Sequence, residues 1–174
     1  MNSENSPTRD DILRYGQNYL VEMEGIALYR MMAAAEEDAK RAEIFEKLAG
    51  NEERHAQRWA RLIQAAGGSI PTYRPGLRVR ALGWIARKFG TRRVLPIISS
   101  MEARDEAGYM EQPEAAGLPA EERAHSRTLW AMSGGSQERH PSLAPSAGML
   151  PLAAEVYALR SSVSTTGWSP TSVW

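Results

Sequence analysis

The chain has 174 residues, of which 43% are hydrophobic and 24% are charged, and its 21 basic side chains balance 21 acidic ones. This balance argues against a general nucleic-acid binder, which carries a basic excess. The absence of cysteine excludes disulfide scaffolds, thiolate zinc sites and cysteine nucleophiles. No segment reads as a signal peptide, and none approaches the ~18 apolar residues that span a bilayer. We therefore expect a cytoplasmic domain without a transmembrane segment.

Residues 9–132 are rich in Ala, Leu, Glu and Arg, which favour helices, and they predict an all-α domain. A first helix begins at Thr8 or Asp10, either of which can start it, and residues 1–8 are expected to be a flexible N-terminus. Apolar residues at helical spacing continue to a short break at Asp38. A second helix follows and ends at about residue 66, where a pair of glycines comes next.

Two further helices are predicted in the second half of the domain. One covers about residues 95–110, and the other is entered through Pro119 and ends at Gly134. Between the two helix pairs lies a long crossover, residues 68–93, with a short amphipathic stretch. Two helical hairpins joined by one long crossover are typical of the ferritin-like four-helix bundle, which is the architecture predicted here.

The composition changes abruptly at Ser133. Residues 133–174 hold nine Ser and four Pro but only four charged side chains. The segment lacks the apolar period and the caps that a helix needs, so we expect a mostly irregular tail.

Two histidines each follow a glutamate by three residues, His55 after Glu52 and His125 after Glu122. Residues at this spacing lie on one helix face, so both side chains of a pair can reach one ion. With 17 Glu in 174 residues, chance places a Glu there before both histidines in about one sequence in a hundred, a figure that helical enrichment in Glu loosens a few-fold. A di-iron carboxylate site needs one further carboxylate from each of the other two helices.

The first and third helices offer these carboxylates. Glu22 precedes Tyr29 by seven residues, and Glu102 precedes Tyr109 by seven, so a carboxylate helix followed by a Glu-x-x-His helix occurs twice. Carboxylate oxygens with a minority of imidazoles suit iron, with manganese as the alternative. The pattern predicts two metal ions between the four helices.

Other acidic residues compete for these positions. Glu24 competes with Glu22, and Asp105 or Glu106 could join or replace Glu102. Glu53, which is adjacent to one of the paired glutamates, is expected to be solvated.

Glu121 stands in the same relation to the other pair, and we expect it to be solvated too. Tyr29 and Tyr109 are candidates for hydrogen bonds to ligand carboxylates, and ordinary core packing is the alternative interpretation. His140 follows the change in composition and is treated as a non-ligand.

The crossover carries basic residues without an acidic one among them, interleaved with apolar residues. One interpretation is contact with an anionic membrane surface. The interpretation that we prefer is a crossover helix that covers the bundle and keeps a solvated basic rim. The seven basic residues are Arg74, Arg78, Arg80, Arg87, Lys88, Arg92 and Arg93.

Three segments of the chain carry a resemblance to a known family: residues 22–29, residues 42–59 (AEIFEKLAGNEERHAQRW) and residues 102–129. They resemble the rubrerythrin-like, ferritin-like domain, in the version fused before a vacuolar-iron-transporter-type membrane domain in membrane-bound ferritins. The crossover sequence LGWIARKFGTRRVLP and the loop 112–117 are similar as well. The resemblance spans about residues 9–132.

The resemblance implies two iron ions, ferroxidase or peroxide-linked chemistry coupled to iron transport, and a homodimer on the cytoplasmic side of a membrane. A different class of function is a non-catalytic iron-sensing or iron-delivery module for a membrane partner. A third is a structural helical module that has lost its metal. Carried over position by position, the resemblance implies as metal ligands Glu22, Glu52, His55, Glu102, Glu122 and His125.

The C-terminus departs from this family, whose members continue into a membrane domain that begins with a motif like NDGLVSNLSL. Residues 157–174 (YALRSSVSTTGWSPTSVW) can be back-translated so that a neighbouring reading frame spells RAAVFGLNDGLVSNLSL. We therefore interpret residues 133–174 as a frameshifted remnant of a membrane domain, arising in the gene or in its sequencing. The nucleotide sequence tests this interpretation directly.

Overall fold

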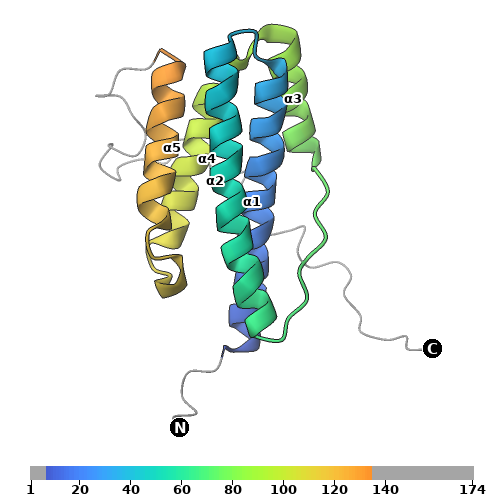
Figure 1. The fold of residues 1–174 in the computed structure, drawn as a ribbon, viewed down its shortest axis with the longest axis vertical. Coiled ribbons are helices and arrows are strands. Elements are labelled where there is room, and N and C mark those ends of the chain that lie inside the picture. Colours follow the sequence, from blue (N-terminus) through green and yellow to red (C-terminus); the bar gives the residue numbers. More distant parts are fainter. Residues whose placement is uncertain (1–6, 135–174) are drawn as a thin grey trace, which may run out of the picture. The chain divides into compact units, whose positions relative to one another are not determined.

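A computed structural model describes residues 7–134 of the chain, and within that range it contains helices and no strands (Figure 1). The prediction of an all-α fold is confirmed. The helices are α1 (Arg9–Ala35), α2 (Ala39–Ala65), α3 (Leu77–Phe89), α4 (Leu95–Tyr109) and α5 (Leu118–Met132), with short 3-10 helices η2 (Thr91–Arg93) and η3 (Pro113–Ala115).

The first two helices begin directly after Thr8 and after Asp38, and each of these residues caps its helix. The Thr8 hydroxyl accepts a hydrogen bond from the N–H of Asp11 at 3.2 Å, and the Asp11 carboxylate accepts one from the N–H of Thr8 at 2.8 Å, which together form a capping box. The Asp38 carboxylate accepts hydrogen bonds from the N–H groups of Lys40 and Arg41. These caps satisfy N–H groups that a helix start leaves unpaired, so they fix where each helix begins.

Glycines shape the connections that follow. Gly67 takes a φ of +73° directly after α2, and Gly117 takes a φ of +93° directly before α5, where Pro119 occupies the first turn. Only glycine adopts such angles readily. A Cβ on Gly68 would lie 2.7 Å from Cγ2 of Ile12, so the chain leaves α2 in close contact with α1.

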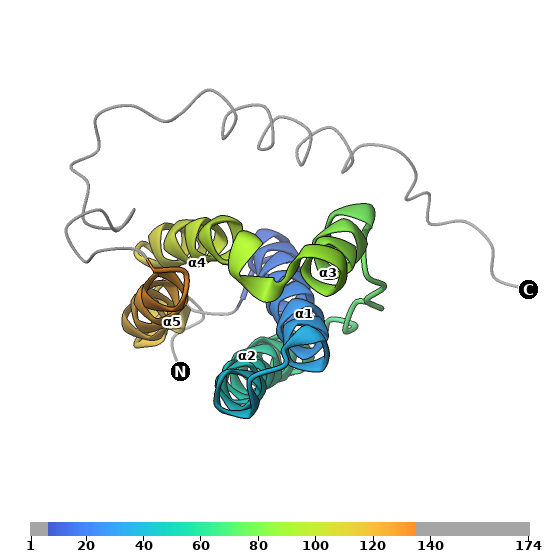
Figure 2. The same ribbon diagram turned by 90° about the horizontal axis from the view of Figure 1, so that it is seen from above.

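The helices pair in chain order. α1 packs along α2 and α4 packs along α5, so the described residues form two helical hairpins. Seen from above, α4 and α5 lie on one side of α1 and α2, while α3 lies outside them next to α1 (Figure 2). The crossover between the hairpins therefore contains the short helix that the sequence predicts.

The apolar core is divided into two clusters by a polar layer. In α1 the buried Glu22 lies between Tyr15 of one cluster and Tyr29 of the other. In α2, α4 and α5 the buried Glu and His residues likewise lie between apolar residues of the two clusters. Burying charge between apolar clusters is costly unless the charge is compensated. The smaller cluster comprises Tyr15, Trp59, Ile63, Tyr109, Ala115 and Leu118.

Several expectations fall outside residues 7–134. These are most of the flexible N-terminus, His140 as a non-ligand, and the irregular tail with its frameshift interpretation, which all stay predictions. Among the described residues, no helix combines the length and the apolar character needed to cross a membrane.

Candidate metal centre

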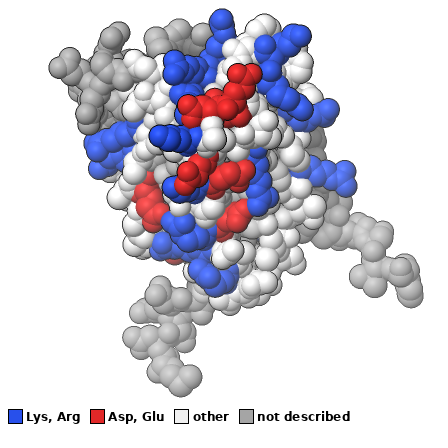
Figure 3. Space-filling model, turned by 45° about the horizontal axis from the view of Figure 1, so that its top comes forward, with Lys and Arg blue, Asp and Glu red and all other residues white. Residues whose placement is uncertain are grey.

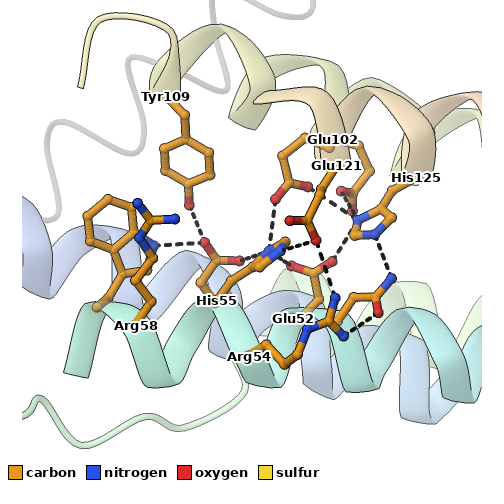
Figure 4. A network of polar contacts seen from close by, with 12 residues as sticks. Glu52, Arg54, His55, Arg58, Glu102, Tyr109, Glu121 and His125 are labelled. Atoms are coloured by element: carbon orange, nitrogen blue, oxygen red, sulfur yellow. Dashed lines mark hydrogen bonds and ion pairs between the residues drawn. The ribbon is translucent and has the colours of Figure 1, made fainter. Parts of the chain in front are cut away.

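The polar layer consists of six residues that are at most 6% exposed. Glu22 comes from α1 and Glu102 from α4, while α2 and α5 each contribute a Glu-x-x-His pair. Figure 4 shows several of these side chains pointing toward one another between the helices. The layer holds the six residues that the sequence singles out as ligands: Glu22, Glu52, His55, Glu102, Glu122 and His125.

The ligand atoms form two groups, and within each group they lie within 4.8 Å of one another. Glu52 and Glu122 belong to both groups, so they occupy the middle of the layer. What we call the His55 group consists of Glu22, Glu52, His55 and Glu122. What we call the His125 group consists of Glu52, Glu102, Glu122 and His125.

In the His55 group the imidazole Nδ1 atom faces three carboxylates. It lies 3.1 Å from Oε1 of Glu122, 3.5 Å from Oε2 of Glu52 and 3.6 Å from Oε2 of Glu22. The ring and the three acids come from α1, α2 and α5, so the group joins one hairpin to the other.

The His125 group repeats this arrangement from the other side. Nδ1 of His125 lies 2.9 Å from Oε1 of Glu52, 3.4 Å from Oε2 of Glu122 and 3.7 Å from Oε2 of Glu102. The two imidazole rings are stacked, with their centroids 6.0 Å apart.

Four atoms of the layer are buried without a hydrogen-bond partner in spite of these short distances: Oε1 of Glu52, Nδ1 of His55, Oε1 of Glu122 and Nδ1 of His125. Buried polar atoms are nearly always hydrogen-bonded, and leaving one unsatisfied costs about 1–3 kcal/mol. Acidic and imidazole atoms that converge on one space without hydrogen bonds are arranged as ligands around a cation would be. These donors therefore fit a divalent metal ion in each group.

The outer and the central carboxylates differ in their electrostatics. Burial raises the pKa of Glu22 to about 8 and raises the pKa of Glu102 well above its ordinary value. Burial acts in the same direction on the central pair, but contacts with the two histidines outweigh it. They lower the pKa of Glu52, and they lower the pKa of Glu122 to about 2.

The histidines respond to the same contacts. Burial by itself lowers the pKa of His125, but its contacts with Glu102, Glu122 and Glu52 outweigh burial and raise the pKa to about 12. The pKa of His55 is raised for the same reason. Protons thus balance the acidic layer when no cation does, and a metal ion has to displace them.

Two tyrosines brace the outer carboxylates across the hairpins. The hydroxyl of Tyr29 in α1 donates to Oε1 of Glu102 in α4 at 2.6 Å, and the hydroxyl of Tyr109 in α4 donates to Oε1 of Glu22 in α1. Of the two interpretations of these tyrosines, the hydrogen bonds favour contact with the candidate ligand carboxylates, although both rings are also buried. Each bond fixes one carboxylate oxygen and leaves Oε2 on the side of the histidine.

Sequence reasoning missed three further contacts. The indole Nε1 of Trp59 donates to Oε1 of Glu22 at 3.0 Å. The far ring nitrogens of the histidines also have partners. Nε2 of His55 lies 3.1 Å from Oε2 of Glu121, and Nε2 of His125 lies 3.0 Å from Nδ2 of Asn51.

A signal for two of these contacts exists in the sequence. Asn51 and Glu121 each stand four residues before a histidine, which places them on the ligand face of the helix. Glu121 is partly exposed, with a side chain that is 45% accessible, and it also reaches His55, a contact that the sequence did not predict. Glu53 is partly exposed, as predicted, and pairs with Arg30.

Within the described part of the chain, the competing acids Glu24, Asp105 and Glu106 belong to neither the His55 group nor the His125 group. Glu106 is buried but accepts a hydrogen bond from Nε of Arg123 at 2.7 Å. Glu24 and Asp105 are only partly buried. On the surface, acidic side chains lie beside basic ones that balance their charge, as the interspersed charges of Figure 3 show, whereas the acids of the central layer lie beside one another and the two histidines.

Comparisons of the chain with protein-family models, with curated proteins and with solved structures return no match. The step from this site to a function therefore depends on the geometry and chemistry of the six side chains.

Proposed function

We propose that this protein is a ferritin-like di-iron protein that binds two Fe(II) ions between its hairpins and oxidises them with dioxygen or hydrogen peroxide. The observation that carries the proposal is the convergence of buried ligand atoms that lack a hydrogen bond, on Glu52, His55, Glu122 and His125. The donor chemistry favours iron, with manganese as the alternative. The resemblance to the rubrerythrin-like domain supports iron, coupling to iron transport and a homodimer.

The architecture supports the same proposal. Two helical hairpins with a helix in the long crossover are the element order expected of a ferritin-like four-helix bundle. In such a bundle the four carboxylate-bearing helices surround the metals. The fold and the ligand pattern thus point to one family of sites independently.

Each part of the layer has a distinct task. Glu52 and Glu122 belong to both groups, so they are placed to contact both ions, while Glu22 and Glu102 each close one end. The tyrosines hold these outer carboxylates in position, and the apolar clusters on either side exclude water. When bound, two Fe(II) would supply one electron each: hydrogen peroxide would take both with two protons to form two waters, and dioxygen would take both with two protons to form hydrogen peroxide.

An anaerobic Fe(II) titration of the whole chain tests the proposal. We expect two ions per chain, followed by catalytic oxidation when peroxide or dioxygen is added. The double variant His55→Ala/His125→Ala should lose tight binding, whereas Glu53→Gln, next to a ligand but on the surface, should keep it. A wild-type chain that binds no iron contradicts the proposal.

A second candidate is a metal-sensing or metal-delivery module that binds iron without turnover and docks on an anionic membrane. One face of α3 is buried against the domain through Val79, Leu82 and Ala86. The other leaves Leu77 and Trp84 exposed by 82% and 57%. The outer face of this amphipathic helix thus carries exposed apolar anchors among basic side chains, a combination that suits a lipid surface.

Vesicle sedimentation tests this candidate. Vesicles that contain phosphatidylglycerol should bind the chain at low salt and release it at high salt, and vesicles of phosphatidylcholine alone should not bind it. Trp84→Ser should weaken binding, while Leu13→Ser, at a side chain that is also 57% exposed but lies in α1, should not. Equal behaviour of the two variants, or no binding, contradicts docking through α3.

A further inference from the structure

The two histidines differ in the partner of the ring nitrogen that points away from the metal groups. Nε2 of His55 faces a carboxylate oxygen of Glu121 at 3.1 Å, and Nε2 of His125 faces the amide nitrogen of Asn51 at 3.0 Å. Each partner comes from the opposite hairpin. The two contacts occupy matching places, but their chemistry is different.

The contact of His55 prepares its ring for ligation. A carboxylate oxygen only accepts hydrogen bonds, so it holds the proton of a neutral imidazole on Nε2. The lone pair of Nδ1 then points into the His55 group, where Nδ1 faces its three carboxylates. Once His55 has given up the proton on Nδ1, the proton that remains is in the right place for ligation through Nδ1.

The contact of His125 does the opposite. An amide nitrogen only donates, so Asn51 as it stands matches an Nε2 that accepts, with the ring proton on Nδ1. Ligation through Nδ1 requires the proton on Nε2, which would meet the N–H of the amide. Asn51 must therefore turn its amide over before His125 can bind an ion.

Arg54 opposes that turn. Its Nη1 donates to Oδ1 of Asn51 at 2.6 Å, which keeps the amide nitrogen toward His125. Its Nη2 donates to Oε2 of Glu121 at 3.3 Å, so one guanidinium contacts the partners of both histidines (Figure 4). Turning the amide would give up the bond between Arg54 and Asn51.

A second difference acts in the same direction. Trp59 stands four residues after His55 and donates to Glu22, but the matching position after His125 is Leu129, which has no donor. Glu22 therefore has two braces, Trp59 and Tyr109, where Glu102 has Tyr29.

We infer that the two metal positions are unequal, the His55 group binding its ion first and more tightly, and that Arg54 and Asn51 are positioning residues that keep the His125 group weaker. This inference rests on the proposed two-ion centre. On this inference the His125 group binds its divalent cation second and releases it first, so the cation that exchanges with solution is the one in the His125 group.

Titration of the whole chain with Co(II), which binds such ligands without reacting with dioxygen, tests the inference. Two binding steps are expected. Repulsion between two cations would weaken the second step even at identical sites, so variants are needed to show that Asn51 and Arg54 cause the difference in affinity. Asn51→Asp supplies an acceptor for Nε2 of His125 and keeps a partner for Arg54, so the second step should tighten about 10-fold or more while the first is unchanged. A misfolded variant could not produce that gain.

Matched variants assign the steps to the groups. Glu121→Gln should weaken the first step about 10-fold, and His125→Ala should keep the tight step that His55→Ala loses. Arg54→Met should tighten the second step, whereas Arg58→Met, whose guanidinium bonds the carbonyl of Ala116 one turn further along, should change neither.

The outcomes separate the two proposals. Two bound ions with a second step that Asn51→Asp leaves unchanged, or a tight step that survives in His55→Ala, overturns the inequality and leaves the metal centre in place. A wild-type chain that binds no Co(II) overturns the metal centre and the inequality together.

Discussion

The two hairpins supply the same set of ligands from helices of different length. α1 and α2 have 27 residues each, whereas α4 and α5 have 15 each. In both hairpins a carboxylate precedes a tyrosine by seven residues, and the next helix carries Glu-x-x-His. About two helical turns of each helix therefore suffice to build half of the layer.

The hairpins differ in what surrounds these ligands. Trp59 in the first corresponds to Leu129 in the second, and Asn51 corresponds to Glu121. Gly25, three residues after Glu22, corresponds to Asp105. The repeat thus places the six candidate ligands, and the neighbours that break the repeat give the two groups different surroundings.

The largest expected effect comes from a ligand that both halves share. Glu52 belongs to both groups, so Glu52→Gln should remove tight binding of both ions, a loss of about 100-fold or more in affinity. Glu22→Gln affects one group and should leave one ion bound. Metal stoichiometry by elemental analysis after dialysis measures the difference, and equal losses in the two variants would show that Glu52 is not shared.

Much of this site could be predicted from the sequence because local patterns encode it. The caps at Thr8 and Asp38 place the first two helices, and spacings of three and seven residues place ligands and tyrosines on one face. The spacing before each histidine places Asn51 and Glu121 on the ligand face, but the contacts that they make across the hairpins could not be predicted. They depend on how the hairpins are rotated about their axes, which no local spacing determines.

Glu106 and Glu121 show the limit of local reasoning. Both are acids near candidate ligands. The sequence predicts Glu106 as a competing ligand and Glu121 as a solvated side chain. Glu106 instead pairs with Arg123 from α5, while Glu121 reaches a histidine of the other hairpin. Which acid gains a partner depends on contacts between helices far apart in the chain.

The tyrosines provide the next test of the comparison. Tyr29→Phe removes the brace that Glu102 receives from α1, whereas Glu22 keeps Trp59 after Tyr109→Phe. Each variant should lower the free energy of unfolding of the apo-protein by about 1–3 kcal/mol because a buried carboxylate loses a donor. The loss should be larger for Tyr29→Phe. Urea unfolding measures both, and the reverse order would show that Trp59 does not support Glu22.

The pH dependence should have opposite signs with and without metal. Glu22 has a pKa raised from 4.5 to about 8, so its contribution to apo-protein stability is present below pH 4.5 and lost as the pH rises through 8. His125 has a pKa raised from 6.5 to about 12, so its contribution is likewise lost as the pH rises above 6.5. The apo-protein should therefore become less stable from about pH 6 to about pH 9.

Metal binding should follow the opposite trend, because the ion displaces protons from these groups and its affinity rises over the same range. Thermal unfolding in chelator and in saturating Mn(II) measures both slopes. A metal-loaded protein that loses stability in parallel with the apo-protein would show that the ion does not occupy this layer.

The smallest expected effect concerns the room that Gly25 leaves for Glu52. A Cβ at Gly25 would lie 3.1 Å from Cγ of Glu52, whereas a Cβ at Gly50 in α2 would meet nothing within 4 Å. Gly50→Ala should stabilise the protein by up to about 1 kcal/mol through helix propensity and leave metal affinity unchanged. Gly25→Ala should gain less stability and weaken both binding steps a few-fold, because Glu52 has to move by a few tenths of an ångström. Unchanged metal affinity in Gly25→Ala would mean that Glu52 can be displaced without loss of binding. The close approach of α1 to Glu52 at Gly25 would then not affect metal affinity.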